Sequence, residues 1–318
     1  MSQPITVEVT RGHHVESTHL VDAVIVNSSG IVIKSWGEPQ RHVLPRSALK
    51  PIQATPLVTS GVADGTSLSS DRLAIACSSH NGEHEHVRVV QDWLEGIGCL
   101  VADLECGAHY PSDPESSILL RMSGQKPDAR HNNCSGKHTG FLALSKFHGF
   151  NSQNYLHPHH ELQTKHVTPA IEDFCRISLR NETPAIDGCG IPAWSIPIAA
   201  LATGWAHMQN RGSGRRLLQA MIDRPFLIAG TNRACTTLMI KSAGRAAVKT
   251  GAEGVFCGVE VKSGHAFALK TRDGNSRASE AVAAWMLDHL GAIEHAAPTE
   301  LQNWAGTNVG EVRVAPNT

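Results

Sequence analysis

Two residues whose side chains can together cleave an amide stand three positions apart near residue 50. Ser47 and Lys50 form the pattern Ser-x-x-Lys, and residues at i and i+3 of a helix share a face. A lysine of ordinary pKa, ~10.4, is charged at neutral pH, but burial or a neighbouring cation lowers that pKa. A neutral Lys50 can then accept the Ser47 proton as the hydroxyl attacks a carbonyl. The pair alone is also typical of an ordinary exposed helical turn.

Two further motifs follow Ser-x-x-Lys in a defined order. Ser79-His80-Asn81 has the Ser-x-Asn pattern and Lys249-Thr250-Gly251 the Lys-Thr-Gly pattern, both of which accompany Ser-x-x-Lys in β-lactamases and penicillin-binding proteins. Lys262-Ser263-Gly264 fits a loose form of the third motif, but it lies between two expected strands with Gly264 at a turn. Lys249 ends an expected strand, and two more strands and a helix follow it, so context favours Lys249. Three motifs in this order predict a serine hydrolase.

A fourth group of residues is rich in thiols. Cys134 and His138 have the i, i+4 spacing of a helix, and Cys189 lies far downstream. Two thiolates and one imidazole nitrogen suit zinc, with a fourth position open to water. The eight cysteines include no Cys-x-x-Cys pair. From the residues alone, two buried structural thiols are therefore the preferred interpretation.

The composition excludes some classes of partner. The chain has 318 residues, a formal net charge of -1 and 41% hydrophobic residues, which argues against nucleic acid or an acidic membrane surface as a partner bound through bulk charge. No apolar run approaches the ~18 residues of a membrane-spanning helix. No export signal is recognisable at the N-terminus, so we expect a cytoplasmic protein with reduced thiols. His157, His159 and His160 are expected in a solvated loop rather than at a metal site.

The expected elements explain how these motifs can meet. Apolar alternation predicts strands over 5–10, 21–26 and 31–36, then over 246–250, 255–261 and 266–271, with a helix over 276–290. The middle of the chain is largely helical in pattern. We therefore predict a single α+β domain, 1–318, in which an antiparallel sheet (about 1–45 and 245–295) is split by a large helical region (about 46–244). The tail, residues 296–318, is expected to be an arm or poorly ordered.

Five specific strings, spread over most of the chain, resemble one family. They are Arg46-Ser47-Ala48-Leu49-Lys50-Pro51, Cys77-Ser78-Ser79-His80, Asn133-Cys134-Ser135-Gly136-Lys137-His138, Asp187-Gly188-Cys189 and Lys249-Thr250-Gly251-Ala252. In these the chain resembles the class 3 L-asparaginases of the rhizobial type. The resemblance implies a fold like that of the serine β-lactamases and penicillin-binding proteins. It also implies hydrolysis of asparagine to aspartate and ammonia through an acyl-enzyme.

The resemblance also implies roles for individual residues. It implies two Ser–Lys pairs, Ser47 with Lys50 and Ser79 with Lys249. It implies one zinc ion per chain, bound by Cys134, Lys137 and Cys189, so that Lys137 replaces His138 as the expected nitrogen ligand. Asp187, which would face the substrate's α-amino group, His80 and Arg46 are the expected substrate-binding residues. No organic cofactor is expected, and the chain is expected to form a homodimer.

Three alternatives remain open from the sequence. A glutaminase would use the same chemistry on a side chain one methylene longer, and one methylene is worth only ~1–3 kcal/mol of discrimination. A β-lactamase or penicillin-binding enzyme would share the three motifs, but those enzymes act outside the cytoplasm. A zinc-binding scaffold without catalytic activity would not need Lys50 near Ser47.

Overall fold

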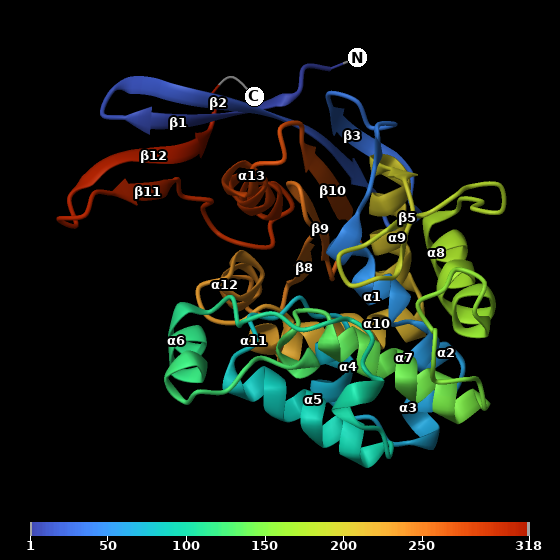
Figure 1. Ribbon diagram of the computed structural model, residues 1–318. Helices are drawn as coiled ribbons and strands as arrows, with labels where there is room; N and C mark the ends of the chain where they lie inside the picture. Colours follow the sequence, from blue (N-terminus) through green and yellow to red (C-terminus); the bar gives the residue numbers. More distant parts are fainter. Residues whose placement is uncertain (1, 317–318) are drawn as a thin grey trace.

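The structure, a computed structural model, describes residues 2–316 and is built on one curled antiparallel sheet (Figure 1). The strands lie in the order β11-β12-β1-β2-β10-β9-β8, and β3 pairs with β2. Their bounds are β1 Ile5–Arg11, β2 His14–Val26, β3 Val32–Trp36, β8 Ala246–Thr250, β9 Val255–Glu260, β10 Ala266–Thr271, β11 Thr299–Gln302 and β12 Asn308–Val314. Short strands form two further pairs, β4 (His42–Val43) with β7 (Ile196–Pro197) and β5 (Ala185–Ile186) with β6 (Pro192–Ala193).

The central strands are apolar because both of their faces are covered. All six residues of β9 are buried, which agrees with a strand packed on both sides. Helix α13 (Ser276–His289) packs against β9 and β10, and α9 (Ile198–Asn210) packs against β2, β9 and β10. Figure 1 shows these two helices on opposite sides of β8–β10. The sheet is therefore the middle layer of this half of the molecule.

A helical region separates the two halves of the sheet in the sequence and lies beside one end of β8–β10 (Figure 1). Its α-helices are α1 Lys50–Gln53, α2 Pro56–Thr59, α3 Val62–Gly65, α4 Ser70–Ala76, α5 His84–Gly96, α6 Pro114–Met122, α7 Ser135–His148, α8 Thr168–Cys175, α9, α10 Gly212–Asp223, α11 Pro225–Ile228 and α12 Ala234–Lys241. Shorter turns are the 3-10 helices η1 Arg46–Leu49, η2 Val101–Asp103 and η3 Ala129–His131 and the π-helix η4 Gln163–Val167. None of the helices within residues 2–316 has the length and apolar character needed to cross a membrane.

Helix α7 forms the centre of this region. Its first eleven residues are buried, and a Cβ atom on Gly136 would lie 2.2 Å from the carbonyl oxygen of Ile75. Only glycine therefore allows α7 to approach α4 so closely. This contact places the start of α7 beside the loop that follows α4.

The predicted sheet split by a helical region is confirmed, but the expectation for the tail was wrong. Residues 299–314 form the β11–β12 hairpin, and β12 pairs with β1 through Val7 and Val314. The sheet therefore extends beyond residue 295. The pattern was missed because three of the four β11 residues are exposed and β12 has only one fully buried residue, Val312.

Candidate active site

The turn that carries Ser47 is held against the end of β8. Pro45 precedes the 3-10 helix η1, and its carbonyl oxygen accepts a hydrogen bond of 3.0 Å from Ala48 N. A Cβ atom on Gly251 would lie 2.4 Å from that same carbonyl oxygen. Gly251 of the Lys-Thr-Gly motif is thus the residue that lets the strand end approach the Ser47 turn.

Arg46 adopts an unusual backbone conformation next to Ser47. Its φ angle is +52°, in the left-handed region that non-glycine residues rarely occupy. Such strain persists where surrounding contacts over-determine it. Here the guanidinium donates a hydrogen bond of 2.8 Å from Nε to Asp187 Oδ1 and forms an ion pair with the same oxygen through Nη2, at 2.7 Å. The strained residue therefore ties the Ser47 turn to the β5–β6 hairpin.

The Lys50 side chain points to Ser79. Its Nζ donates hydrogen bonds to Ser79 Oγ (2.9 Å), Ser78 O (2.6 Å) and Asn133 O (3.3 Å). Three acceptors therefore surround this one nitrogen. Among residues 2–316 no hydrogen bond joins Lys50 Nζ to Ser47 Oγ. The spacing predicted a direct Ser47–Lys50 contact, whereas in the structure the Lys50 amine contacts the serine of the second motif.

The second motif lies in an extended segment after α4. Ser79 N donates to Ile228 O (2.9 Å) and Asn81 N to Ala229 O (2.8 Å), so residues 79–81 pair with the chain that follows α11. Ser79 is buried, at 6% exposure. Backbone pairing on one side and Lys50 on the other fix the position of its hydroxyl.

Lys249 is fully buried next to these residues. Its Nζ donates to Thr250 O at 3.0 Å. Burial, together with the charges of Lys50 and Arg233, lowers the pKa of Lys249 from 10.5 to about 7, and the Cys235 thiol opposes this shift. Among residues 2–316 no hydrogen bond links Lys249 to Ser79, so their pairing stays a prediction.

The competing lysine, Lys262, is exposed in the turn between β9 and β10. The Glu260 carboxylate accepts hydrogen bonds from the backbone N–H groups of Lys262 and Ser263 and from Ser263 Oγ. Lys262-Ser263-Gly264 thus has the geometry of a hairpin turn, whereas Lys249 lies among the motif residues.

The three expected zinc ligands come together from two elements. Cys134 and Lys137 lie at the start of α7, and Cys189 lies in the turn between β5 and β6. Lys137 Nζ is 3.1 Å from Cys189 Sγ. The hydrogen bond with Cys189 lowers the pKa of Cys134, and although burial opposes this, the Lys50 and Lys137 ammonium groups lower it further. The group therefore places a thiol of lowered pKa near the amines of Lys50 and Lys137.

His138, the alternative nitrogen ligand, faces elsewhere. Its Nδ1 lies 2.9 Å from the Tyr155 hydroxyl, which accepts a hydrogen bond from Glu105 N. The pair packs edge to face. Residues 2–316 contain no cluster of three or more His, Cys, Asp or Glu side chains suited to a metal; the expected set has only two such residues, because its third member is a lysine.

Asp187 lies at the start of the turn that carries Cys189. Asp187 N donates to Ile191 O (2.9 Å) and Gly190 N to Asp187 O (2.8 Å), which closes the turn. Burial raises the pKa of the Asp187 carboxyl, but the hydrogen bonds from Arg46 and the charge of Lys137 outweigh burial and leave it below its ordinary value. Asp187 is thus a carboxylate whose side chain remains partly accessible.

Both ring nitrogens of His80, an expected substrate-binding residue, contact the protein. Nδ1 accepts from Gly82 N at 3.1 Å, so Nε2 carries the proton and donates to Ser135 Oγ at 2.9 Å. Burial lowers the pKa of His80, with a contribution from His86, on which its ring is stacked. This neutral, buried ring links residues 79–81 to α7.

One charged residue at the site was not anticipated from the sequence. Arg233, directly before α12, donates from Nη1 to Asn81 Oδ1 at 2.7 Å and reaches Ser79 O at 3.5 Å. The partners are about 150 residues apart in the chain, and no local motif surrounds Arg233. Only the tertiary fold reveals this contact.

Comparisons with known proteins gave a structural similarity and a family match. A solved structure of a β-lactamase from Mycobacterium bovis is similar to this chain, with 14% sequence identity, a TM-score of 0.43 and coverage of 85% of this chain and 94% of that one. No curated protein matches the chain. The profile of the family described as L-asparaginase II matches residues 7–314, a span that contains every site residue described above. The chain therefore belongs to the L-asparaginase II family.

Proposed function

We propose that this protein hydrolyses the side-chain amide of L-asparagine to L-aspartate and ammonia, with Ser47 as the nucleophile. Family membership over residues 7–314 supports asparaginase activity. The observation that carries the mechanism is the contact between buried Lys50 Nζ and Ser79 Oγ, 2.9 Å, beside the Ser47 turn. The site thus combines two serines and two lysines, which are residue types that can carry out acyl transfer.

The acylation step uses Lys50 and Ser79 in sequence. Ser47 Oγ attacks the side-chain amide carbon, and its proton passes to a neutral Lys50. Lys50 then donates a proton to Ser79 Oγ as the Ser79 hydroxyl donates its own to the amide nitrogen, so the leaving group departs as ammonia. The product is an ester between Ser47 and the aspartyl group. Catalytic hydrogen bonds often tighten only once substrate binds, which accommodates a Ser47 hydroxyl not yet bonded to Lys50.

Deacylation reverses the proton path. A water molecule attacks the ester carbon, and its proton moves to the Lys50 amine. Ser47 Oγ then regains a proton as aspartate forms. Lys249 has a pKa of about 7, so a large fraction of its amine is neutral at neutral pH. Lys249 can therefore accept a proton from the Lys50–Ser79 network, so that Lys50 and Lys249 need not both be charged at the same time.

Substrate recognition is assigned to the Arg46–Asp187 pair. The carboxylate of Asp187 suits the substrate's α-ammonium group, and the guanidinium of Arg46 suits its α-carboxylate. In the free chain the two side chains neutralise each other at 2.7 Å. An α-amino acid offers both opposite charges and can satisfy both partners at once, which a simple amide cannot do.

We also propose that Cys134, Lys137 and Cys189 hold one zinc ion per chain. The donor set fits, because two thiolates and an amine are ligands that zinc accepts, with one position left open. When bound, zinc would supply a positive charge and a Lewis acid beside the substrate. The chain's own residues must prepare the site, because Lys137 has to lose its proton. Burial lowers the pKa of Lys137, but the neighbouring Cys189 and Cys134 outweigh burial and raise it.

The test is ammonia release by the purified protein from asparagine and from glutamine, with a chromogenic cephalosporin as a third substrate. Ammonia from asparagine that is lost in Ser47→Ala supports the proposal. Faster turnover of glutamine than of asparagine would show that the protein is a glutaminase. Turnover of the cephalosporin alone would show that it is a β-lactamase. Absence of turnover with all three would favour a non-catalytic zinc protein. A cytoplasmic location and a homodimer remain predictions.

A further inference from the structure

The segment that presents Ser79 to Lys50 is stabilised on its other side by one arginine. Arg233 Nη1 donates to Asn81 Oδ1 at 2.7 Å and lies 3.5 Å from Ser79 O. Ser112 Oγ donates to the same Asn81 oxygen at 3.1 Å, and the Asn81 amide donates to Thr231 O at 3.1 Å. Both ends of the Asn81 side chain are thus used to fix residues 79–81.

We propose that Arg233 is a positioning residue for the reaction, which holds residues 79–81 so that the Ser79 hydroxyl stays in contact with Lys50. The proposal rests on the proposed function, since Ser79 matters only if it moves a proton. Within residues 2–316, no hydrogen bond or ion pair joins Arg233 to the proposed substrate-binding pair, Arg46 and Asp187. Its effect passes through Asn81 and the Ser79 carbonyl.

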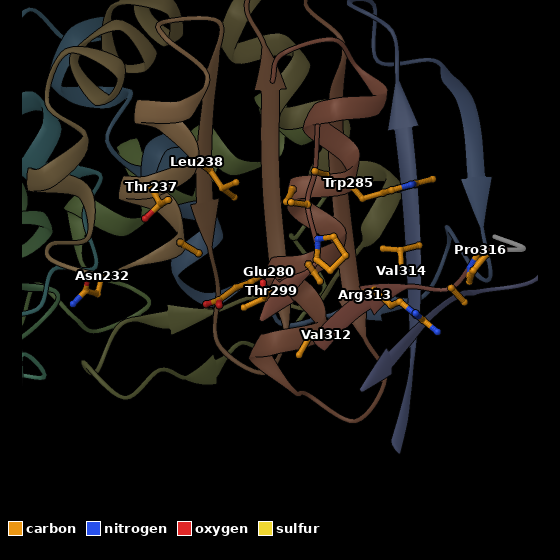
Figure 2. A pocket seen from close by; sticks show the side chains of 17 residues that line it. Asn232, Thr237, Leu238, Glu280, Trp285, Thr299, Val312, Arg313, Val314 and Pro316 are labelled. Atoms are coloured by element: carbon orange, nitrogen blue, oxygen red, sulfur yellow. The ribbon is translucent and has the colours of Figure 1, made fainter. Parts of the chain in front are cut away.

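The surroundings of Arg233 leave its charge available to this site. Among residues 2–316 no carboxylate forms an ion pair with Arg233. Its sequence neighbours Asn232 and Ala234 line a cavity of about 420 Å³, together with Glu280 of α13. Figure 2 shows Asn232 and Glu280 on the wall of this cavity. Burial raises the pKa of Glu280, and Arg233 opposes that shift from nearby.

A second effect of the same guanidinium reaches Lys249. Besides Arg233, the charged or titratable groups that face Lys249 are Lys50, the thiols Cys235 and Cys134, and the thiols Cys77 and Cys257. Lys50 and Arg233 are the two cations in this set, and both lower the pKa of Lys249. Loss of the Arg233 charge should therefore raise that pKa.

Three substitutions separate geometry from charge. Arg233→Met removes both, Arg233→Gln keeps a donor for Asn81 Oδ1 without charge, and Arg233→Lys keeps the charge on a differently shaped donor. We expect Arg233→Met to lower kcat on the order of 10- to 100-fold, the scale of a misplaced catalytic group, with little change in KM. The acidic limb of the pH profile is the low-pH range in which kcat/KM rises as Lys249 loses its proton. This limb should move to higher pH in the Arg233→Met and Arg233→Gln variants and stay in place in the Arg233→Lys variant.

The controls make each outcome informative. Arg216→Met, which breaks an exposed ion pair between Arg216 of α10 and Asp64 of α3, should leave kcat and the acidic limb unchanged. Hydrogen exchange of the peptide over residues 77–83 measures, without any substrate, how firmly residues 79–81 are held. Arg233→Met should accelerate this exchange. If the wild-type chain releases no ammonia, the proposed function fails and exchange alone decides the role of Arg233.

Two results would overturn the inference. The first is an Arg233→Met variant with wild-type kcat, limb position and exchange. The second is a loss of activity that only follows the unfolded fraction, with the limb unmoved in every variant, because a purely structural residue would behave in this way. If Arg233→Met does not fold, the comparison of Arg233→Gln with Arg233→Lys still decides between these outcomes.

Discussion

The Lys50 amine donates a hydrogen bond of 2.9 Å to Ser79 Oγ, which joins the first Ser–Lys motif to the second. The two motifs are therefore parts of one polar cluster rather than two separate dyads. The same amine also donates to Asn133 O, next to Cys134, and its charge lowers the pKa of the Cys134 thiol. Lys50 consequently lies between the proposed nucleophilic centre and the proposed zinc ligands. A substitution at either site should therefore affect the other through Lys50.

Ser47→Ala should lower kcat for asparagine by several orders of magnitude, on the order of the ~10⁴–10⁶ seen when a nucleophile is removed. The side chain is only half-buried, so the melting temperature should change little. Ammonia release under saturating substrate is the measurement. Ser263→Ala, in the β9–β10 turn, serves as the matched serine control. Near wild-type turnover by the Ser47→Ala variant would remove Ser47 from the mechanism.

Lys249→Met should abolish most activity, whereas Lys262→Met should not. Lys249 is fully buried among the motif residues, and Lys262 is exposed in a hairpin turn. Methionine has a similar length without an amine, and it leaves no unpaired charge in the interior, so the variant should fold. Steady-state rates and circular dichroism of both variants test this. The reverse pattern would show that Lys262 is the functional lysine.

The sequence predicted most of the fold that positions these groups. The expected strands over 246–250, 255–261 and 266–271 match β8, β9 and β10 to within one residue, and the last helix matches α13. These elements are buried, so their apolar periodicity is strong. The exposed β11–β12 hairpin has no such pattern. The contacts of the Lys50 amine also escaped prediction. The turn η1 is a 3-10 helix that begins at the left-handed Arg46, so ideal α-helical spacing does not apply there.

The pH profile should show an acidic limb near 7. Burial lowers the pKa of Lys249 to about 7 in the folded chain, against 10.5 for an ordinary lysine. If a neutral Lys249 is needed, kcat/KM rises as pH increases through that value. Between about 7 and 10.5 the unfolded chain binds more protons at this residue, so its contribution to the free energy of unfolding increases with pH. A limb above pH ~9 would indicate an ordinary lysine.

Asp187→Asn should raise KM for asparagine more than it lowers kcat. A hydrogen bond to a charged group is worth ~1.5–3 kcal/mol, which corresponds to roughly a 10- to 100-fold weaker interaction with the α-ammonium group. The substitution also removes the negative charge that pairs with Arg46, which weakens one restraint on the turn at Ser47. Asp64→Asn, an exposed aspartate on α3 paired with Arg216, is the control. An unchanged KM in Asp187→Asn would move substrate recognition elsewhere.

The zinc content of the protein should depend on Cys134 and Cys189. Protein purified without chelator should contain one zinc per chain, and metal analysis of Cys134→Ser and Cys189→Ser should show its loss. Cys99→Ser, at a buried cysteine of another loop, should keep the metal. Because Ser47 and the lysines already supply a nucleophile and a base, removal of zinc should raise KM more than it lowers kcat.

The zinc affinity should also depend on pH in a defined direction. Lys137 and both cysteines must be deprotonated to bind a metal. Burial lowers the pKa of Lys137, but the neighbouring Cys189 and Cys134 outweigh burial and raise it. Proton release therefore accompanies binding, and titration with a competing chelator should give tighter binding as pH increases. Stoichiometric zinc whose removal eliminates kcat at saturating asparagine would instead place the metal in the chemical step. Protein with no zinc at any pH would leave Cys134 and Cys189 as structural thiols.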